Sequence, residues 1–186
     1  DFSNALGGTS AILAAANGVD LKIIGIYSRA PKAFTIMTKA DGINSIKDLK
    51  GKKIAGPKGT ILHQLLLAAL DQNQMSIDDV EYINMSIPQA VTAMNSGNVD
   101  AALVAGAPVL QAMDAGARIL TTGEGLLDAT IVIAVRGEFL REHPDLVKRY
   151  MDVHYRSLEY MKEHPEEVYK MAAEETEMSR ENVVTM

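Results

Sequence analysis

The stretch SGNVDAALVAGAPVLQAMDAGARIL, residues 96–120, sets out one α/β unit in order. The apolar run at 100–105 predicts a strand, and Gly106 follows it as a turn residue. Pro108 suits the first turn of a helix over 107–116, because its missing N–H would have no helical partner there. The apolar run that comes next, ARILTT, predicts a second strand. A strand, a helix and a strand in this order indicate an α/β fold.

The N-terminus shows the same order of residue types. Residues 1–10 read DFSNALGGTS, in which an Asp, small or apolar residues and Gly7 precede Thr9, and an Ala-rich amphipathic segment follows. Gly106 and Pro108 hold the equivalent places in the later stretch. Any strand–turn–helix unit punctuated by Gly resembles another, so the spacing alone does not establish an internal repeat.

Strands and helices alternate along the rest of the chain. Short apolar runs with β-branched residues predict strands, and amphipathic runs that follow capping residues or Pro predict helices. We expect strands at 21–27, 33–39, 52–56, 80–85 and 129–136, and helices at 44–51, 60–74, 87–97, 143–164 and 165–175. This alternation predicts parallel α/β sheets.

Composition excludes several classes of protein. A chain of 186 residues with 47% hydrophobic and 23% charged residues can bury a core. No apolar run reaches the ~18 residues of a membrane-spanning helix. A net charge of −6 and an aromatic content of 5% argue against a surface for nucleic acid. The absence of Cys excludes disulfides, a thiol nucleophile and Cys-bound metal.

Neither a metal site nor a nucleotide-hydrolysing loop is expected. The four His residues form no H-x-x-x-H or H-E-x-x-H pair, so we expect no metal and no cofactor. His143 and His164 each precede a Pro that starts a helix, a position better explained by capping. GPKGT, at residues 56–60, lacks the G-x-x-x-x-G-K-[ST] spacing of a phosphate loop.

Three longer motifs carry a family resemblance over essentially the whole chain. They are SIKDLKGKKIAGPKGT at 45–60, SIPQAVTAMNSGNVDAALVAGAPVLQAMDAGARIL at 86–120 and VIAVRGEFLREHPDLVKRYM at 132–151. In this order they resemble the solute-binding proteins of ABC importers for nitrate, sulfonates, taurine and thiamine precursors. Members of that family are substantially longer, so the resemblance implies a fragment that lacks the export signal, the first strand–helix units and C-terminal helices.

The resemblance implies a two-lobed, periplasmic-binding-protein-like (type II) α/β fold, incomplete at both ends, with the ligand held between the lobes. Residues 1–40 and 128–186 would form parts of lobe one, and residues 41–127 would form lobe two. The crossing segments are expected at 39–42 and 126–130. The repeated Asp-to-Gly unit would then mark two facing sides of one ligand site.

Three turns that follow strands are expected to face this site, because ligands of open α/β sheets bind beyond the carboxyl ends of strands. Each turn leaves backbone N–H groups at a helix N-terminus, which suits an anion. Glycines let a ligand approach the backbone and hydroxyls add donors, although the hydroxyls are also explained as ordinary helix N-caps. The candidate ligand-binding residues in these turns are Asn4, Gly8, Thr9, Ser10, Lys58, Gly59, Thr60, Gly106 and Ala107.

Two further candidates lie just beyond the strand at 21–27. They are Ser28 and Arg29, and Arg29 would either pair with an anionic ligand or stay solvated. Where many members of the family carry an aromatic and an acidic residue in a W-[DE]-P turn, this chain has Gly106 and Ala107. The pocket is expected to be roomier there and to offer no carboxylate to an amine-bearing ligand.

The function implied by the resemblance is capture of a small, anionic or oxygen-rich organic ligand and its delivery to an ABC importer permease. The protein is expected at the periplasmic or extracellular face of the membrane. It would contact the membrane only through the permease or through a lipid anchor missing from this chain. No nucleophile–base pair is visible, so no catalytic residue is expected. The alternative is an enzyme on the same fold, of the thiamine-pyrimidine or menaquinone-pathway type, because a fold alone does not exclude catalysis.

Overall fold

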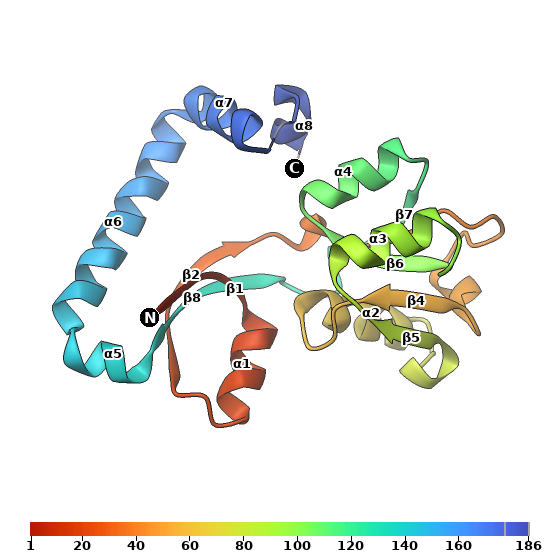
Figure 1. The fold of residues 1–186 in the computed structure, drawn as a ribbon, viewed down its shortest axis with the longest axis horizontal. Helices are drawn as coiled ribbons and strands as arrows, with labels where there is room; N and C mark the ends of the chain where they lie inside the picture. The colour runs from red at the N-terminus through yellow and green to blue at the C-terminus, as the bar shows by residue number, and fades with distance from the viewer. Residues whose placement is uncertain (177, 186) are drawn as a thin grey trace.

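A five-stranded sheet forms the larger part of the protein in the computed structural model, which describes residues 1–176 and 178–185 (Figure 1). Its strands lie in the order β5-β4-β6-β3-β7. β4 runs parallel to β5 and β6, whereas β3 runs antiparallel to both β6 and β7. The strands are β5 (Glu81–Asn84), β4 (Lys53–Gly56), β6 (Ala101–Ala105), β3 (Phe34–Thr38) and β7 (Arg118–Thr122).

Helices cover both faces of this sheet. Alternate residues of a strand point to opposite faces, so Ile36 and Leu103 pack in one cluster with α2 (Ile61–Gln72). Their neighbours Met37 and Ala102 pack in a second cluster on the other face. That cluster includes residues of α3 (Ile87–Asn95) and α4 (Ala107–Asp114). We call this sheet with α2, α3 and α4 the second unit.

A three-stranded sheet forms the centre of what we call the first unit. β8 lies between β1 and β2 and runs antiparallel to both. α1 follows β1, and α6 leaves the sheet as a long arm with α7 and α8 at its far end (Figure 1). The elements are β1 (Phe2–Gly7), α1 (Gly8–Ala16), β2 (Leu21–Arg29), β8 (Thr130–Arg136), α5 (Gly137–Glu142), α6 (Pro144–Glu163), α7 (Pro165–Thr176) and α8 (Arg180–Thr185).

Three short 3-10 helices complete the described elements: η1 (Pro31–Ala33), η2 (Ile46–Leu49) and η3 (Ile77–Asp79). Proline starts α6 and α7, as the sequence predicts. The prediction of parallel sheets is wrong for the whole first unit and for β3. β8 enters the first unit from the second, and this return direction makes it antiparallel to both of its neighbours.

The predicted boundary at residue 40 does not coincide with the change of sheet. β3, which that boundary assigns to the first lobe, is hydrogen-bonded to β6 and β7 in the second unit. The segment at 39–42 follows β3 and contacts β7, since the Arg118 guanidinium donates to the carbonyls of Ala40 and Ile43 at 2.8 and 2.6 Å. Glu177 and Met186, which the predicted return segment 128–186 includes, lie outside the described residues.

The two connections between the units run side by side. The Gly123 N–H donates to the carbonyls of Pro31 and Phe34, both at 3.0 Å. A Cβ atom at Gly123 would lie 2.7 Å from the Pro31 oxygen, so only Gly allows this approach. The chain therefore crosses first near η1 and returns after Gly123, close to the later of the two predicted positions.

Candidate functional site

A cavity of about 200 Å³ lies where the two units meet, and both contribute to it. Its walls come from the start of α1, the strand β8, the loop before α2 and the ends of β6 and β3. We call it the junction cavity. Its lining residues are Ala5, Gly7, Ser10, Phe34, Pro57, Thr60, Ile61, Leu62, Ile87, Ala105 and Ile131.

Two helices begin at this cavity with uncapped N-termini. Gly7 is the N-cap of α1 and Thr60 is the N-cap of α2, and both residues line the cavity. Within the described residues, no side chain accepts a hydrogen bond from the first N–H groups of either helix. These N–H groups and the positive ends of the two helix dipoles favour an anion.

The three predicted hydroxyl donors bond to protein atoms. Thr60 Oγ1 donates to the Pro57 carbonyl at 2.9 Å, and Ser10 Oγ donates to the Gly59 carbonyl at 3.1 Å. Thr9 Oγ1 donates to Gln64 Oε1 at 2.6 Å. A hydroxyl has one proton to give, so these side chains are not free donors in this arrangement. Neither helix has a side-chain cap hydrogen bond at its N-cap residue. The backbone N–H groups are the donors left for a ligand.

Strand β5 fixes the loop GPKGT from the side. The Tyr82 hydroxyl donates to the Gly56 carbonyl at 2.7 Å, and the Lys58 N–H donates to Asn84 Oδ1 at 2.9 Å. Burial raises the pKa of Tyr82 to about 12, so its hydroxyl keeps its proton and remains a donor. Gly59 has a φ of +74°, which favours Gly at this position.

His63 lies beside this loop on the first turn of α2. Its ring centroid is 5.0 Å from that of Tyr82. Burial, with a smaller contribution from the positive charge of Lys58, lowers the pKa of His63 below its ordinary value. At neutral pH the imidazole is therefore uncharged.

Only part of the predicted site is found at the junction cavity. Ser10 and Thr60 line it, and Gly8, Thr9 and Gly59 adjoin lining residues in the chain. Asn4 and Ser28 line a different cavity of about 440 Å³ beside α6. Asn4 lies at an irregularity of β1, where the pairing with β8 shifts between Ser3 and Leu6 and Ala5 has φ 60°.

The remaining predicted residues lie near the cavity without lining it. Gly106 and Ala107 follow the lining residue Ala105, and Gly106 is the N-cap of α4. Arg29 is exposed and forms no ion pair with any residue in the described part of the chain. Lys58 is also exposed, and its N–H rather than its ammonium group has an assigned partner.

The apolar side chains that line the cavity are not among the residues predicted from the sequence. Ile61 and Ile87 are the first residues of α2 and α3, so both directly follow a turn after a strand. That placement is a signal the sequence carries. Phe34 and Ile131 come from β3 and β8, next to the connections between the units, and only the crossing of the chain brings them together.

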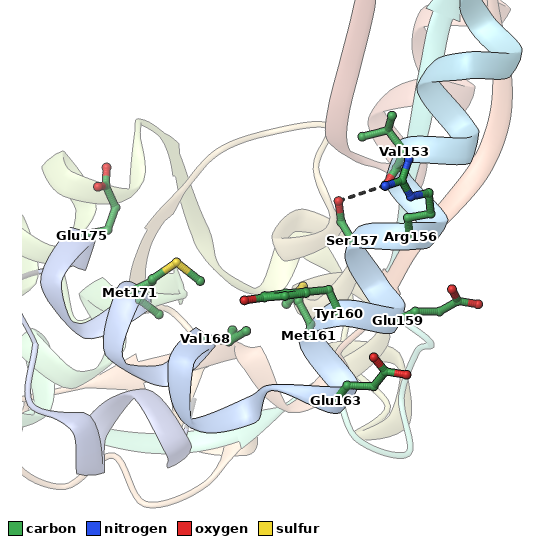
Figure 2. Close-up of a pocket in the computed structure, with 11 residues that line it drawn as sticks. Val153, Arg156, Ser157, Glu159, Tyr160, Met161, Glu163, Val168, Met171 and Glu175 are labelled. Atoms are coloured by element: carbon green, nitrogen blue, oxygen red, sulfur yellow. Dashed lines mark hydrogen bonds between the residues drawn. The ribbon is translucent and has the colours of Figure 1, made fainter.

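A larger cavity, of about 1010 Å³, lies elsewhere, in the elbow between α6 and α7. Figure 2 shows Tyr160 and Met161 of α6 facing Val168 and Met171 of α7. It is lined only by these two helices, and its charged residues include three carboxylates and one Arg. The carboxylates outnumber the one Arg and repel a negative charge, so this elbow offers little to a small anion.

Neither a cluster of metal ligands nor a membrane-spanning helix is found among the described residues. No group of three or more His, Asp and Glu side chains there could hold a metal ion. Among the helices of residues 1–176 and 178–185, none combines the length and the apolar composition needed to cross a bilayer.

Comparisons with known proteins point to one family. A family model described as NMT1/THI5 like matches residues 5–168. A Bacillus subtilis (strain 168) protein named for binding aliphatic sulfonates is 35% identical over 170 residues, which cover 90% of this chain and 51% of that one. The taurine-binding periplasmic protein of Escherichia coli (strain K12) is 30% identical over 149 residues, 78% of this chain and 46% of that one. This chain spans about half the length of these curated relatives.

Solved structures confirm the predicted two-lobed α/β fold. The alkanesulfonate-binding protein SsuA from Xanthomonas axonopodis pv. citri, bound to MOPS, matches with a TM-score of 0.87 and 27% identity over 96% of this chain and 63% of that one. A desulfurization enzyme, DSZB, matches with a TM-score of 0.71 and 19% identity over 95% of this chain and 67% of that one, which shows a shared fold alone. The chain is thus a partial-length member of this fold.

Proposed function

The chain belongs to the NMT1/THI5-like family, and on that premise we propose that it binds a small organic sulfonate in the junction cavity. The delivery of this ligand to an ABC importer permease, outside the cytoplasmic membrane, is part of the same proposal. It is supported by the relatives named as sulfonate-binding and taurine-binding proteins.

One observation carries the proposal: two uncapped helix N-termini, one from each unit, meet at a cavity whose other walls are apolar. A sulfonate has a permanent negative charge spread over three oxygens, and it would accept hydrogen bonds from both helices. Its organic group would contact the side chains of Phe34, Ile87 and Ile131. The volume is below the ~300–1,000 Å³ of pockets for drug-sized ligands, so the ligand is expected to be small.

Binding of useful strength requires the two units to close on the ligand. One exposed helix terminus contributes about 0.3–1 kcal/mol, whereas micromolar affinity requires about 8 kcal/mol. Closure removes water and strengthens each hydrogen bond in the site. The paired connections at Pro31 and Gly123 give a place where one unit can turn against the other.

An enzyme on this fold remains the alternative, because the desulfurization enzyme shares the architecture. The relatives with the higher identity are named as binding proteins, which favours capture without conversion. Mass spectrometry of a sulfonate incubated with the protein distinguishes the two: the ligand is expected to be recovered unchanged.

Calorimetry with matched ligands tests the proposal directly. Propanesulfonate, butyrate and butanol have similar organic groups but differ in charge and in the number of oxygens. We expect propanesulfonate to bind most tightly and butanol not to bind, because the alcohol offers no anion to the two helix N-termini. Equal affinity for the alcohol and the sulfonate would contradict an anion site.

Thr60→Asp then tests whether the ligand binds in the junction cavity. The new carboxylate can cap α2, so the free energy of unfolding should hold or rise slightly. It also occupies the N–H groups of α2 and repels an anion, so the affinity for propanesulfonate should fall at least about tenfold, or 1.4 kcal/mol. Thr60→Val is the control, because it removes the hydroxyl but leaves these N–H groups free. If Thr60→Asp bound propanesulfonate as tightly as the parent protein, this turn would not be part of the binding site.

A further inference from the structure

Two hydrogen bonds join the units directly beside the junction cavity. Thr9 Oγ1, on the first turn of α1, donates to Gln64 Oε1 on α2 at 2.6 Å. Ser10 Oγ, the next residue of α1, donates to the Gly59 carbonyl at 3.1 Å. The partners are 55 and 49 positions apart in the chain and belong to different sheets. Both bonds therefore depend on how the first unit lies against the second.

We infer that Gln64 is a positioning residue for ligand capture: it accepts the hydrogen bond from Thr9 only when the units are closed, and so favours the arrangement that surrounds the ligand. This rests on the proposed function, in which closure creates the complete site. Gln64 does not line the cavity, so it acts through Thr9 and α1 rather than on the ligand.

The surroundings of the bond support this role. α1 approaches the loop before α2 closely here: a Cβ atom at Gly59 would lie 3.3 Å from Leu13 Cδ1. Gln64 is exposed and packs in no described core cluster, so its one assigned side-chain interaction is the bond across the units. If α1 moved away from α2, Thr9 Oγ1 and Gln64 Oε1 would both return to water.

Linkage sets the size of the effect. A bond present in the closed state and absent in the open state shifts the equilibrium toward closure by its net strength. A ligand that binds only the closed state gains at most the same factor, because its apparent affinity scales with the closed fraction. A neutral side-chain hydrogen bond of ordinary strength corresponds to about a two- to tenfold change in affinity.

A double-mutant cycle tests the pair. Thr9→Val and Gln64→Met remove the donor and the acceptor while keeping similar shapes, and Gln72→Met makes the same change at the exposed last residue of α2. Each change at the pair should weaken propanesulfonate binding about two- to tenfold, and the double variant should be no weaker than the weaker single variant. Gln72→Met should bind like the parent protein. Unchanged affinity in Gln64→Met, or losses that multiply in the double variant, would overturn the inference.

A distance measurement without ligand separates this inference from the proposed function. The chain has no Cys, so Val19→Cys and Asp71→Cys place one spin label just beyond the end of α1 and one in the last turn of α2. Gln64→Met should shift the interlabel distances in ligand-free protein, and Gln72→Met should not. If no sulfonate binds but this shift occurs, the proposed function fails and the role of Gln64 in closure stands. Identical distances in both variants would overturn that role, whatever the protein binds.

Discussion

The two sheets differ in how completely they are covered. In the second unit, α2 lies on one face of the five-stranded sheet and α3 and α4 lie on the other, so Ile36 and Met37 are both fully buried. In the first unit, β1 and β2 are both edge strands, and Ile26 of β2 is 50% exposed. Most of the large apolar side chains that are exposed in the described residues belong to the first unit or its C-terminal helices.

This difference in coverage suggests a division of roles, in which the second unit supplies most of the stability and the first unit closes on the ligand. The second unit holds both core clusters and supplies a rigid base for the loop GPKGT. The first unit contributes α1, which meets that loop through side-chain hydrogen bonds and the contact of Leu13 with Gly59.

The largest expected effect contrasts one buried and one exposed isoleucine. Ile36→Ala in β3 removes a fully buried side chain between α2 and the sheet, so the free energy of unfolding should fall by about 2–5 kcal/mol. Ile26→Ala in β2 should change it by no more than about 0.5 kcal/mol, because that side chain is half exposed. Urea unfolding followed by circular dichroism measures both. Similar losses at the two positions would show that the first unit is packed as tightly as the second.

Local signals in the sequence predicted most of the elements. Pro144 and Pro165 start α6 and α7, and Pro108 lies in the first turn of α4. The direction of β8 and the sheet to which β3 belongs could not be predicted in this way. Both depend on pairings between segments far apart in the chain, and apolar runs look alike whichever partner they find.

The site was predictable at the level of turns but not of hydrogen bonds. Turns after strands do reach the junction cavity, because the strand ends of an α/β sheet gather the starts of helices. The partner of each hydroxyl was not predictable, since Thr9 finds Gln64 only when the two units meet. The apolar wall from Phe34 and Ile131 has the same origin, in the crossing of the chain between the sheets.

A smaller effect compares the two glycines of the similar N-terminal and central stretches. Both are helix N-caps, but Gly106 has φ 69° and ψ −150°, while Gly7 has φ −59° and ψ 129°. The first conformation is nearly restricted to Gly, so Gly106→Ala should lower the free energy of unfolding by about 1–3 kcal/mol. Gly7→Ala should change it by less than about 1 kcal/mol, because any residue adopts its backbone conformation. Urea unfolding measures both variants, and an equal loss at Gly7 would show that space rather than backbone strain decides these positions.

The smallest expected effect is on the pH dependence of the free energy of unfolding, and it concerns His63 of the second unit. Burial and the charge of Lys58 lower the pKa of His63 in the folded protein below its ordinary 6.5, so in acid the unfolded chain binds the proton more readily. This contribution to stability is complete above pH 6.5 and is lost as the pH falls through the lowered pKa. His63→Gln removes the titrating group while the carboxylates remain, so its free energy of unfolding should fall less than that of the parent protein between about pH 7 and pH 5. Because His63 lies on α2, hydrogen exchange should show the difference in the second unit. Parallel pH profiles for the two proteins would mean that His63 titrates alike in the folded and unfolded chains, and a steeper fall in His63→Gln would reverse the sign of the shift.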